Sequence, residues 1–114
     1  MRVTTDLWVS ALLRRIFASG GFGAVVTRGS ASAGAIFIVS RNRLGEARLY
    51  GPAPQMGYDD ARPDDRLFVA VPNADDDEKI EQKLARERRF DADLWVIEIE
   101  PAGDGAGLFE IMTP

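Results

Sequence analysis

The chain has 114 residues, which is room for one domain, since single domains cluster at roughly 100–150 residues. It contains 0 His and 0 Cys, which excludes disulfides, imidazole- or thiol-based nucleophilic catalysis, and the usual ligand sets of zinc and iron–sulfur sites. The net charge of −4 is divided unevenly. Residues 1–57 carry seven basic and two acidic side chains, whereas residues 58–114 carry seven basic and sixteen acidic ones.

Two interpretations of this charge division stay open. The two halves can interleave in one fold, with their charges solvated. Alternatively, a basic face can meet an acidic partner, a second copy of the chain or a polyanion.

The first predicted element is a helix, which Thr4, Thr5 and Asp6 open because Thr5 or Asp6 can accept free amide hydrogens of the first turn. Two neighbouring apolar stripes at i, i+4, i+8 spacing give it a broad apolar face. Their members are Trp8, Leu12 and Ile16, and Val9, Leu13 and Phe17.

Asp6 precedes the apolar run 7–13, and Arg14 and Arg15 follow it. A membrane span needs about 20 apolar residues, and a secretory signal places its charges before the apolar stretch. We therefore expect a cytoplasmic protein that does not enter a membrane.

Glycines after Ser19 end this helix, and the pattern then changes to strands. Predicted strands cover residues 22–28, 35–40 and 46–50. The second is apolar on both faces, which indicates a central position in the sheet. A loop of small residues, 29–34, joins the first two strands, so the three strands are predicted to form an antiparallel meander.

The second half contains a predicted polar loop at residues 55–65 and a strand at 66–71. A second helix follows, with acidic residues at its start, cations at its end, and Phe90 folding back onto the core. Strands at residues 94–100 and 108–112 complete the chain, the latter at an edge.

The element order α-β-β-β-β-α-β-β predicts a single α+β domain over residues 1–114. We expect a mostly antiparallel sheet of five to six strands packed with two helices. The doubly apolar second and fifth strands favour helices on both faces. The aromatic core is predicted to contain Trp8, Phe17, Phe37, Phe68 and Trp95.

Three segments resemble ligand sites, and each has a simpler interpretation. The small-residue loop after Arg28 can offer amides to a phosphate, but it lacks P-loop spacing and leads into a strand, so a flexible hairpin loop is favoured. The carboxylates Asp59, Asp60, Asp64 and Asp65 have the chemistry to bind Mg²⁺ or Ca²⁺, although neighbouring arginines compete for them and a solvated loop is favoured. The acidic run Asp75, Asp76, Asp77 and Glu78 is explained by helix initiation. We therefore expect no metal and no cofactor.

Four segments of the chain are similar to a known family. They are residues 6–15, 33–35, 49–53 and 93–100, with the sequences DLWVSALLRR, AGA, LYGPA and DLWVIEIE. These segments extend over nearly the whole chain, which resembles a family of short alphaproteobacterial proteins known as domain of unknown function 1491. The resemblance implies a bacterial cytoplasmic protein and implies no activity, cofactor or catalytic residue.

We hypothesise a small non-catalytic binding or protein-interaction module, with a homodimer as one form, because no catalytic constellation is present and the charge is divided. The nominated ligand- or partner-binding residues are Arg14, Arg15, Arg41, Arg43, Arg48 and Tyr50. Tyr50 stands at a strand end beside a rigid turn, from which its hydroxyl can point into a cleft.

The alternative function is an enzyme that uses a carboxylate, Tyr and Arg on a small anionic substrate. It requires a cleft that brings Tyr50 near one of these arginines and a carboxylate with a perturbed pKa. Nucleic-acid binding is a third option, which the sequence pI of about 4.8 and the lack of interleaved aromatic rings disfavour.

Overall fold

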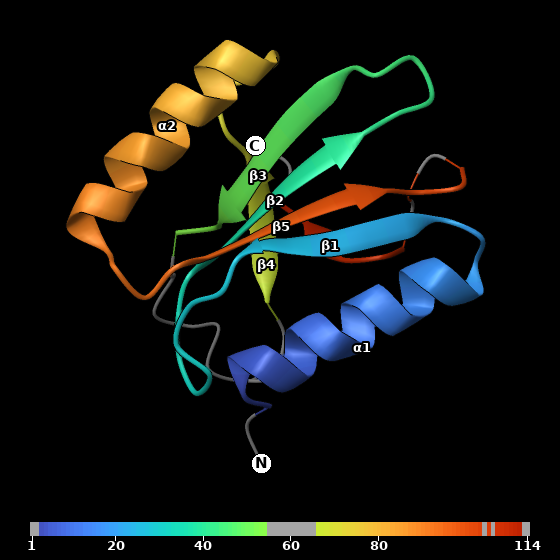
Figure 1. The fold of residues 1–114 in the computed structure, drawn as a ribbon, viewed down its shortest axis with the longest axis horizontal. Coiled ribbons are helices and arrows are strands. Elements are labelled where there is room, and N and C mark those ends of the chain that lie inside the picture. The colour runs from blue at the N-terminus through green and yellow to red at the C-terminus, as the bar shows by residue number, and fades with distance from the viewer. Residues whose placement is uncertain (1–2, 55–65, 104, 106, 113–114) are drawn as a thin grey trace.

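The computed structural model describes residues 3–54, 66–103, 105 and 107–112. These residues form a six-stranded sheet and two helices, which confirms the predicted α+β class and element order (Figure 1). In chain order the elements are α1 (Thr5–Ala18), β1 (Phe22–Thr27), β2 (Ile36–Arg41), β3 (Ala47–Pro52), β4 (Leu67–Ala70), α2 (Asp77–Phe90), β5 (Trp95–Glu100) and β6 (Glu110–Ile111). The predicted loop at residues 55–65 lies outside the described residues.

Helix α1 begins and ends where its sequence predicts. Near its start, Oδ1 of Asp6 accepts the amide of the next residue at 2.8 Å. At its end, Gly20 has a φ of 92°, and the amides of Gly20 and Gly21 donate to the carbonyls of Phe17 and Ile16 at 3.1 and 2.9 Å. These two bonds form a Schellman motif, which needs a residue that tolerates positive φ.

The acidic run before α2 initiates that helix, as predicted. Oδ1 of Asp76 accepts the backbone amide of Lys79 at 2.8 Å, so Asp76 caps the first turn. Acidic side chains occupy the first turn and basic side chains the last turn, where each interacts favourably with the helix dipole. They are Asp77, Glu78, Arg88 and Arg89.

The strand order is β1-β5-β2-β3-β4-β6, which corrects the predicted topology in two respects. Strand β5 lies between β1 and β2, antiparallel to β1 and parallel to β2. The antiparallel meander therefore consists of β2, β3 and β4 rather than the first three strands. Strands β4 and β6 also pair in parallel, so the sheet is mixed rather than mostly antiparallel. The apolar start of β5 fits its place between β1 and β2, because its side chains enter the apolar cores on both faces of the sheet.

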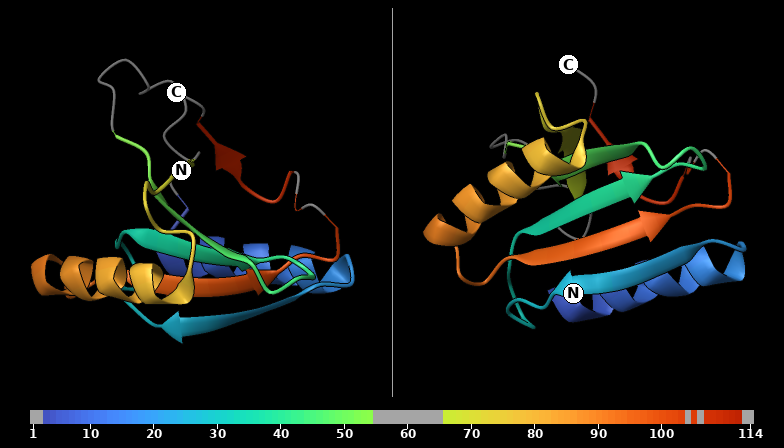
Figure 2. Two further views of the ribbon diagram at one scale, coloured as in Figure 1. Left: turned by 90° about the horizontal axis from the view of Figure 1, so that it is seen from above. Right: turned by 45° about the horizontal axis from the view of Figure 1, so that its top comes forward.

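Each face of the sheet carries its own apolar core, and the two helices lie on opposite faces (Figure 2). On one face, Leu12 and Ile16 of α1 pack with Trp95 and Ile97 of β5. On the other face, Ile80 and Leu84 of α2 pack with side chains of β2, β3 and β5. The prediction that both faces are covered is confirmed. Neither helix within the described residues has the length and apolar character needed to cross a bilayer.

Two aromatic residues do not lie in the core, contrary to the prediction. Phe17 is 52% exposed, because the sheet formed by the described residues ends at β1 and none of its strands covers the flank of α1 on which Phe17 lies. Phe90 is 82% exposed, because it is the last residue of α2, whose C-terminal end extends beyond the sheet (Figure 1). Phe37, Phe68 and Trp95 are buried as predicted.

Candidate functional site

Among the nominated residues, Arg41 is held by two carboxylates. Its Nη2 lies 2.6 Å from Oδ1 of Asp77, and its Nε lies 3.1 Å from Oε1 of Glu98. The hydrogen bond to Asp77, followed by the interactions with Glu98, raises the pKa of the Arg41 guanidinium above its ordinary value. Because Arg41 belongs to β2, Glu98 to β5 and Asp77 to α2, this cluster ties the helix to the sheet.

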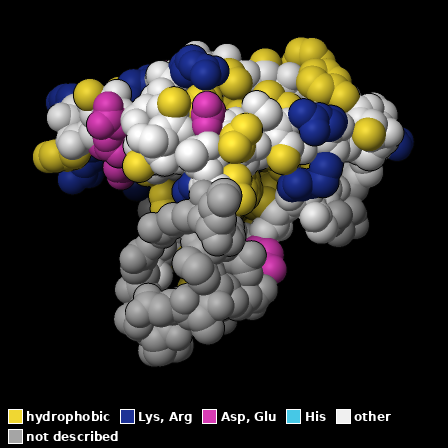
Figure 3. Space-filling model, turned by 90° about the horizontal axis from the view of Figure 1, so that it is seen from below, with side chains coloured by type: hydrophobic (Ala, Val, Ile, Leu, Met, Phe, Trp, Pro, Cys, Tyr) yellow, Lys and Arg dark blue, Asp and Glu magenta, His cyan; other side chains and the backbone are white. Residues whose placement is uncertain are grey.

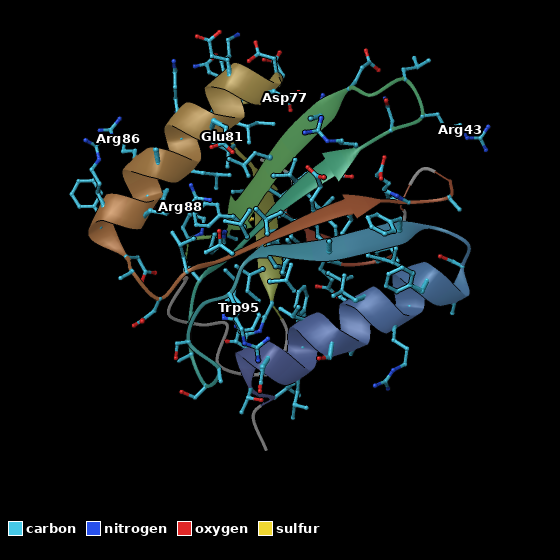
Figure 4. The ribbon with its side chains drawn as sticks, in the orientation of Figure 1. Arg43, Asp77, Glu81, Arg86, Arg88 and Trp95 are labelled. Atoms are coloured by element: carbon cyan, nitrogen blue, oxygen red, sulfur yellow. The ribbon has the colours of Figure 1, made fainter. Side chains whose placement is uncertain are left out.

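Arg15 and Arg43 donate to the segment between β5 and β6. Nη2 of Arg15 donates to the carbonyl of Leu108 at 2.7 Å, and Nη2 of Arg43 donates to the carbonyl of Ala102 at 3.4 Å. Figure 4 shows Arg43 at the tip of the β2–β3 hairpin, far from α2. Arg14 is exposed on α1. These arginines therefore do not converge on one ligand.

Arg48 lines a cavity of about 220 Å³ together with Lys79, Asn73 and Asp75. Tyr50 does not line this cavity, and its ring packs against Phe109 with the centroids 5.4 Å apart. The combination of Tyr, Arg and carboxylate required by the enzymatic hypothesis is therefore not assembled in this cavity.

The small-residue loop binds the chain's own backbone. The amide of Ser30 donates to the carbonyl of Asp93 at 3.0 Å. A Cβ added at Gly29 or Gly34 would lie 2.0 or 2.4 Å from that same carbonyl oxygen. Both glycines are needed because the backbone at Asp93 passes against them. The expectation of a hairpin loop is wrong, since the loop crosses the start of β5 and joins strands that are not neighbours.

The carboxylates considered for a metal contribute no site to the described structure. Asp59, Asp60, Asp64 and Asp65 lie outside the described residues. Elsewhere, in the part of the chain that the structure describes, no group of three His, Cys, Asp or Glu side chains is placed to hold a metal ion.

The outer edge of β1 is an open apolar surface. Strand β1 is the outermost strand of the sheet, so within the described residues no strand pairs with its outer edge. Its six residues, FGAVVT, carry no charge. We define the β1 edge surface as this edge together with the exposed side chains of Phe17, Phe22, Val25 and Val26. Figure 3 shows a hydrophobic patch at its upper right, where α1 ends and β1 begins, with basic side chains beside it.

The aromatic part of the β1 edge surface is pre-arranged by α1. The rings of Phe17 and Phe22 make an edge-to-face contact with centroids 5.9 Å apart. One turn earlier on α1, Leu13 packs so closely on Gly23 that a Cβ there would lie 2.7 Å from Cδ2 of Leu13. Glycine therefore allows the helix to sit directly against β1, with Phe17 at the edge.

The far end of β1 is irregular and anchored. The pairing with β5 shifts between Val25 and Thr27, which leaves Val26 as an additional residue with its side chain 55% exposed. Nη2 of Arg88 donates to Oγ1 of Thr27 at 3.1 Å, so α2 reaches across the sheet to this end of β1. The strand is regular over Phe22–Val25 and held at both ends.

Sequence reasoning missed this surface, although one signal in the chain points to it, namely the absence of charge in β1. The apolar spacing of α1 assigns Phe17 to the core, because a stripe pattern does not distinguish a covered flank from an open one.

A family model described as "Protein of unknown function (DUF1491)" matches residues 3–109. The chain belongs to this family. This match confirms the resemblance seen in the four sequence segments. No curated protein matches the chain.

Solved DUF1491-like structures share the whole fold. The solution structure of protein Atu0922 from A. tumefaciens is 46% identical, with 100% of this chain and 98% of that chain covered and a TM-score of 0.83. A crystal structure of a DUF1491 family protein from Caulobacter crescentus CB15 is 30% identical, with 99% of this chain and 100% of that chain covered and a TM-score of 0.79. The family is one of unknown function, so function must be argued from the surface itself.

Proposed function

We propose that this DUF1491 protein is a small non-catalytic interaction module that binds a protein partner through the β1 edge surface. The observation that carries the proposal is an uncharged strand at an open sheet edge, flanked by exposed aromatic and aliphatic side chains. An open strand offers unpaired amides and carbonyls to another strand. Charged side chains, Pro and β-bulges commonly protect such edges. Strand β1 contains no charge and no Pro, and its bulge at Val26 leaves Phe22–Val25 regular and open.

Phe17 and Phe22 are the anchors of the proposed contact. Each ring is about half exposed, and their mutual contact limits the conformations that binding would have to fix. Full burial of such a side chain contributes roughly 1.5–3 kcal/mol. Strand pairing would add backbone hydrogen bonds and fix the orientation of the partner.

The nominated arginines differ in whether they are available to bind a partner. Arg14 follows Leu13 on α1 and is exposed, so it remains a candidate contact beside the β1 edge surface. Arg15, Arg41 and Arg43 already bind groups of their own chain.

We also propose a cytoplasmic location, which the absence of cysteine fits. Cell fractionation tests it, and recovery with the periplasm or the membrane would contradict it.

Site-specific photo-crosslinking in alphaproteobacterial cells tests the proposed surface. A benzophenone amino acid replaces Phe22 in one variant and Leu44 in the control, because Leu44 is an exposed apolar residue of the β2–β3 hairpin. We expect a discrete protein adduct from position 22 and none from position 44. No adduct at position 22, or the same adducts at both positions, would contradict the proposal.

A further inference from the structure

We propose that the partner is a second copy of this chain, joined by antiparallel pairing of the two β1 strands about a two-fold axis. This inference rests on the proposed function, because it names the occupant of the β1 edge surface. Paired edge strands would join the two sheets into one, and closed two-fold dimers are the commonest protein assemblies.

The residues of β1 suit pairing with themselves. In a two-fold antiparallel pair, opposite residues point to the same face, so one residue lies on the axis. With Ala24 on the axis, the regular residues Gly23 and Val25 lie opposite each other, and Phe22 of one copy lies beside the bulge residue Val26 of the other. Aromatic and β-branched side chains form stabilising cross-strand pairs. The small side chain of Ala24 leaves room for close approach of the two strands at the centre.

The charges near the two ends of β1 are complementary under this symmetry. Arg88 binds the Thr27 end, and Arg28 follows directly after it. At the other end, Phe22 lies opposite Glu100 of β5. Antiparallel pairing brings Arg28 and Arg88 of one copy toward Glu100 of the other. Like ends would meet in a parallel arrangement, so the charges favour the antiparallel one.

The two α1 helices add the area that strand pairing lacks. A two-fold axis perpendicular to the joined sheet keeps both α1 helices on the same face, side by side. Stable interfaces bury about 1,200–2,000 Å² in total, more than one short strand pair provides. Phe17, on the flank of α1 beside β1, lies where the second helix would cover it.

Sedimentation equilibrium of the purified chain measures the association. We expect a dimer for the natural sequence. Phe22→Lys and Val26→Lys should raise the dimer dissociation constant by about tenfold or more, because each removes an apolar contact and each dimer would have to desolvate two ammonium groups. The matched control Leu44→Lys makes the same change at a residue 83% exposed on the β2–β3 hairpin and should leave the constant unchanged. Circular dichroism confirms that each variant is folded.

A single engineered cysteine tests the position of the axis. Because the chain has 0 Cys, Ala24→Cys introduces one thiol per copy. Opposite residues of an antiparallel pair lie about 4.5–5.5 Å apart at Cα, within disulfide range. We expect a covalent dimer of Ala24→Cys on mild oxidation and a monomer of Leu44→Cys under the same conditions.

The outcomes separate this inference from the proposed function. A monomeric natural chain, or a dimer that the two lysine variants leave intact, overturns the inference. If position 22 still crosslinks to a different protein in cells, the proposed function stands with another partner. If position 22 forms no adduct while the chain sediments as a monomer, both proposals fail.

Discussion

Trp95 donates its indole N–H to the carbonyl oxygen of Ser30 across 2.8 Å, linking the first residue of β5 to the loop that follows β1. The guanidinium of Arg28 lies 5.0 Å from the centroid of the same ring. Trp95 is 1% exposed, so its only polar atom is satisfied inside the core. This contact holds the small-residue loop 29–34, which crosses the start of β5, and thereby also holds the end of β1.

Replacing Trp95 should separate its apolar and polar contributions. Trp95→Ala is expected to lower the free energy of unfolding by roughly 3–5 kcal/mol. Trp95→Phe keeps most of the apolar contact and leaves the Ser30 carbonyl without its donor, which costs about 1–3 kcal/mol. Urea denaturation measures both values. Equal stability of Trp95→Phe and the natural chain would show that the hydrogen bond contributes nothing.

Two Gly→Ala substitutions, one in the small-residue loop 29–34 and one outside it, are expected to differ sharply in their effect on stability. Gly34→Ala places a Cβ 2.4 Å from the Asp93 carbonyl, a backbone atom that moves only if β5 moves. We expect a loss of about 2–3 kcal/mol or more. Gly103→Ala is the control, because no atom of the described residues lies within 4 Å of a Cβ added there. Thermal unfolding of the two variants compares them, and similar midpoints would refute the close packing of the loop on β5.

The sequence predicted the elements well because each is decided by local chemistry. The glycines after Ser19 end α1, and Asp76 caps α2, through bonds within a few residues. The strand order depends instead on pairing between distant segments. An apolar strand such as β5 fits any central position, and the fold places it between β1 and β2.

The candidate site was less accessible to sequence reasoning for the same physical reason. The sequence alone gives no sign that Arg41 is paired, because its partners Glu98 and Asp77 lie 57 and 36 positions away along the chain. The apolar spacing of α1 predicts that Phe17 is a core residue, whereas the described sheet ends at β1 and leaves Phe17 exposed. Both properties depend on the strand order and on the packing of the helices, which are set by contacts between distant segments.

The Asp6 carboxylate makes a pH-dependent contribution to stability. Oγ1 of Thr4 donates to Oδ1 of Asp6 at 2.6 Å, and this bond is the largest cause that lowers the pKa of Asp6 below its ordinary 3.8. A lowered native pKa means that the contribution is fully present above the unfolded pKa and is lost as pH falls through the native pKa. Thr4→Ala should therefore raise the pKa of Asp6 in an NMR titration. It should reduce stability near neutrality but not at pH values well below the native pKa. An unchanged Asp6 titration would contradict this assignment.

Capping of α2 by Asp76 predicts a difference between neighbouring carboxylates. Asp76→Ala removes the acceptor of the Lys79 amide and should lower the free energy of unfolding by about 1 kcal/mol. Asp75→Ala removes only an exposed ion pair with Lys79 at 3.4 Å, which contributes roughly 0.5 kcal/mol or less. Denaturant titration of both variants decides between them. Equal effects would mean that charge at the helix start, rather than the cap, stabilises α2.

Association of two chains through β1 is tested most directly by isotope-filtered NMR on an equimolar mixture of labelled and unlabelled protein. The proposed dimer predicts nuclear Overhauser contacts between the Phe22 ring of one copy and the Val26 methyl groups of the other. Intermolecular contacts confined to other surfaces, or none at millimolar concentration, would contradict it.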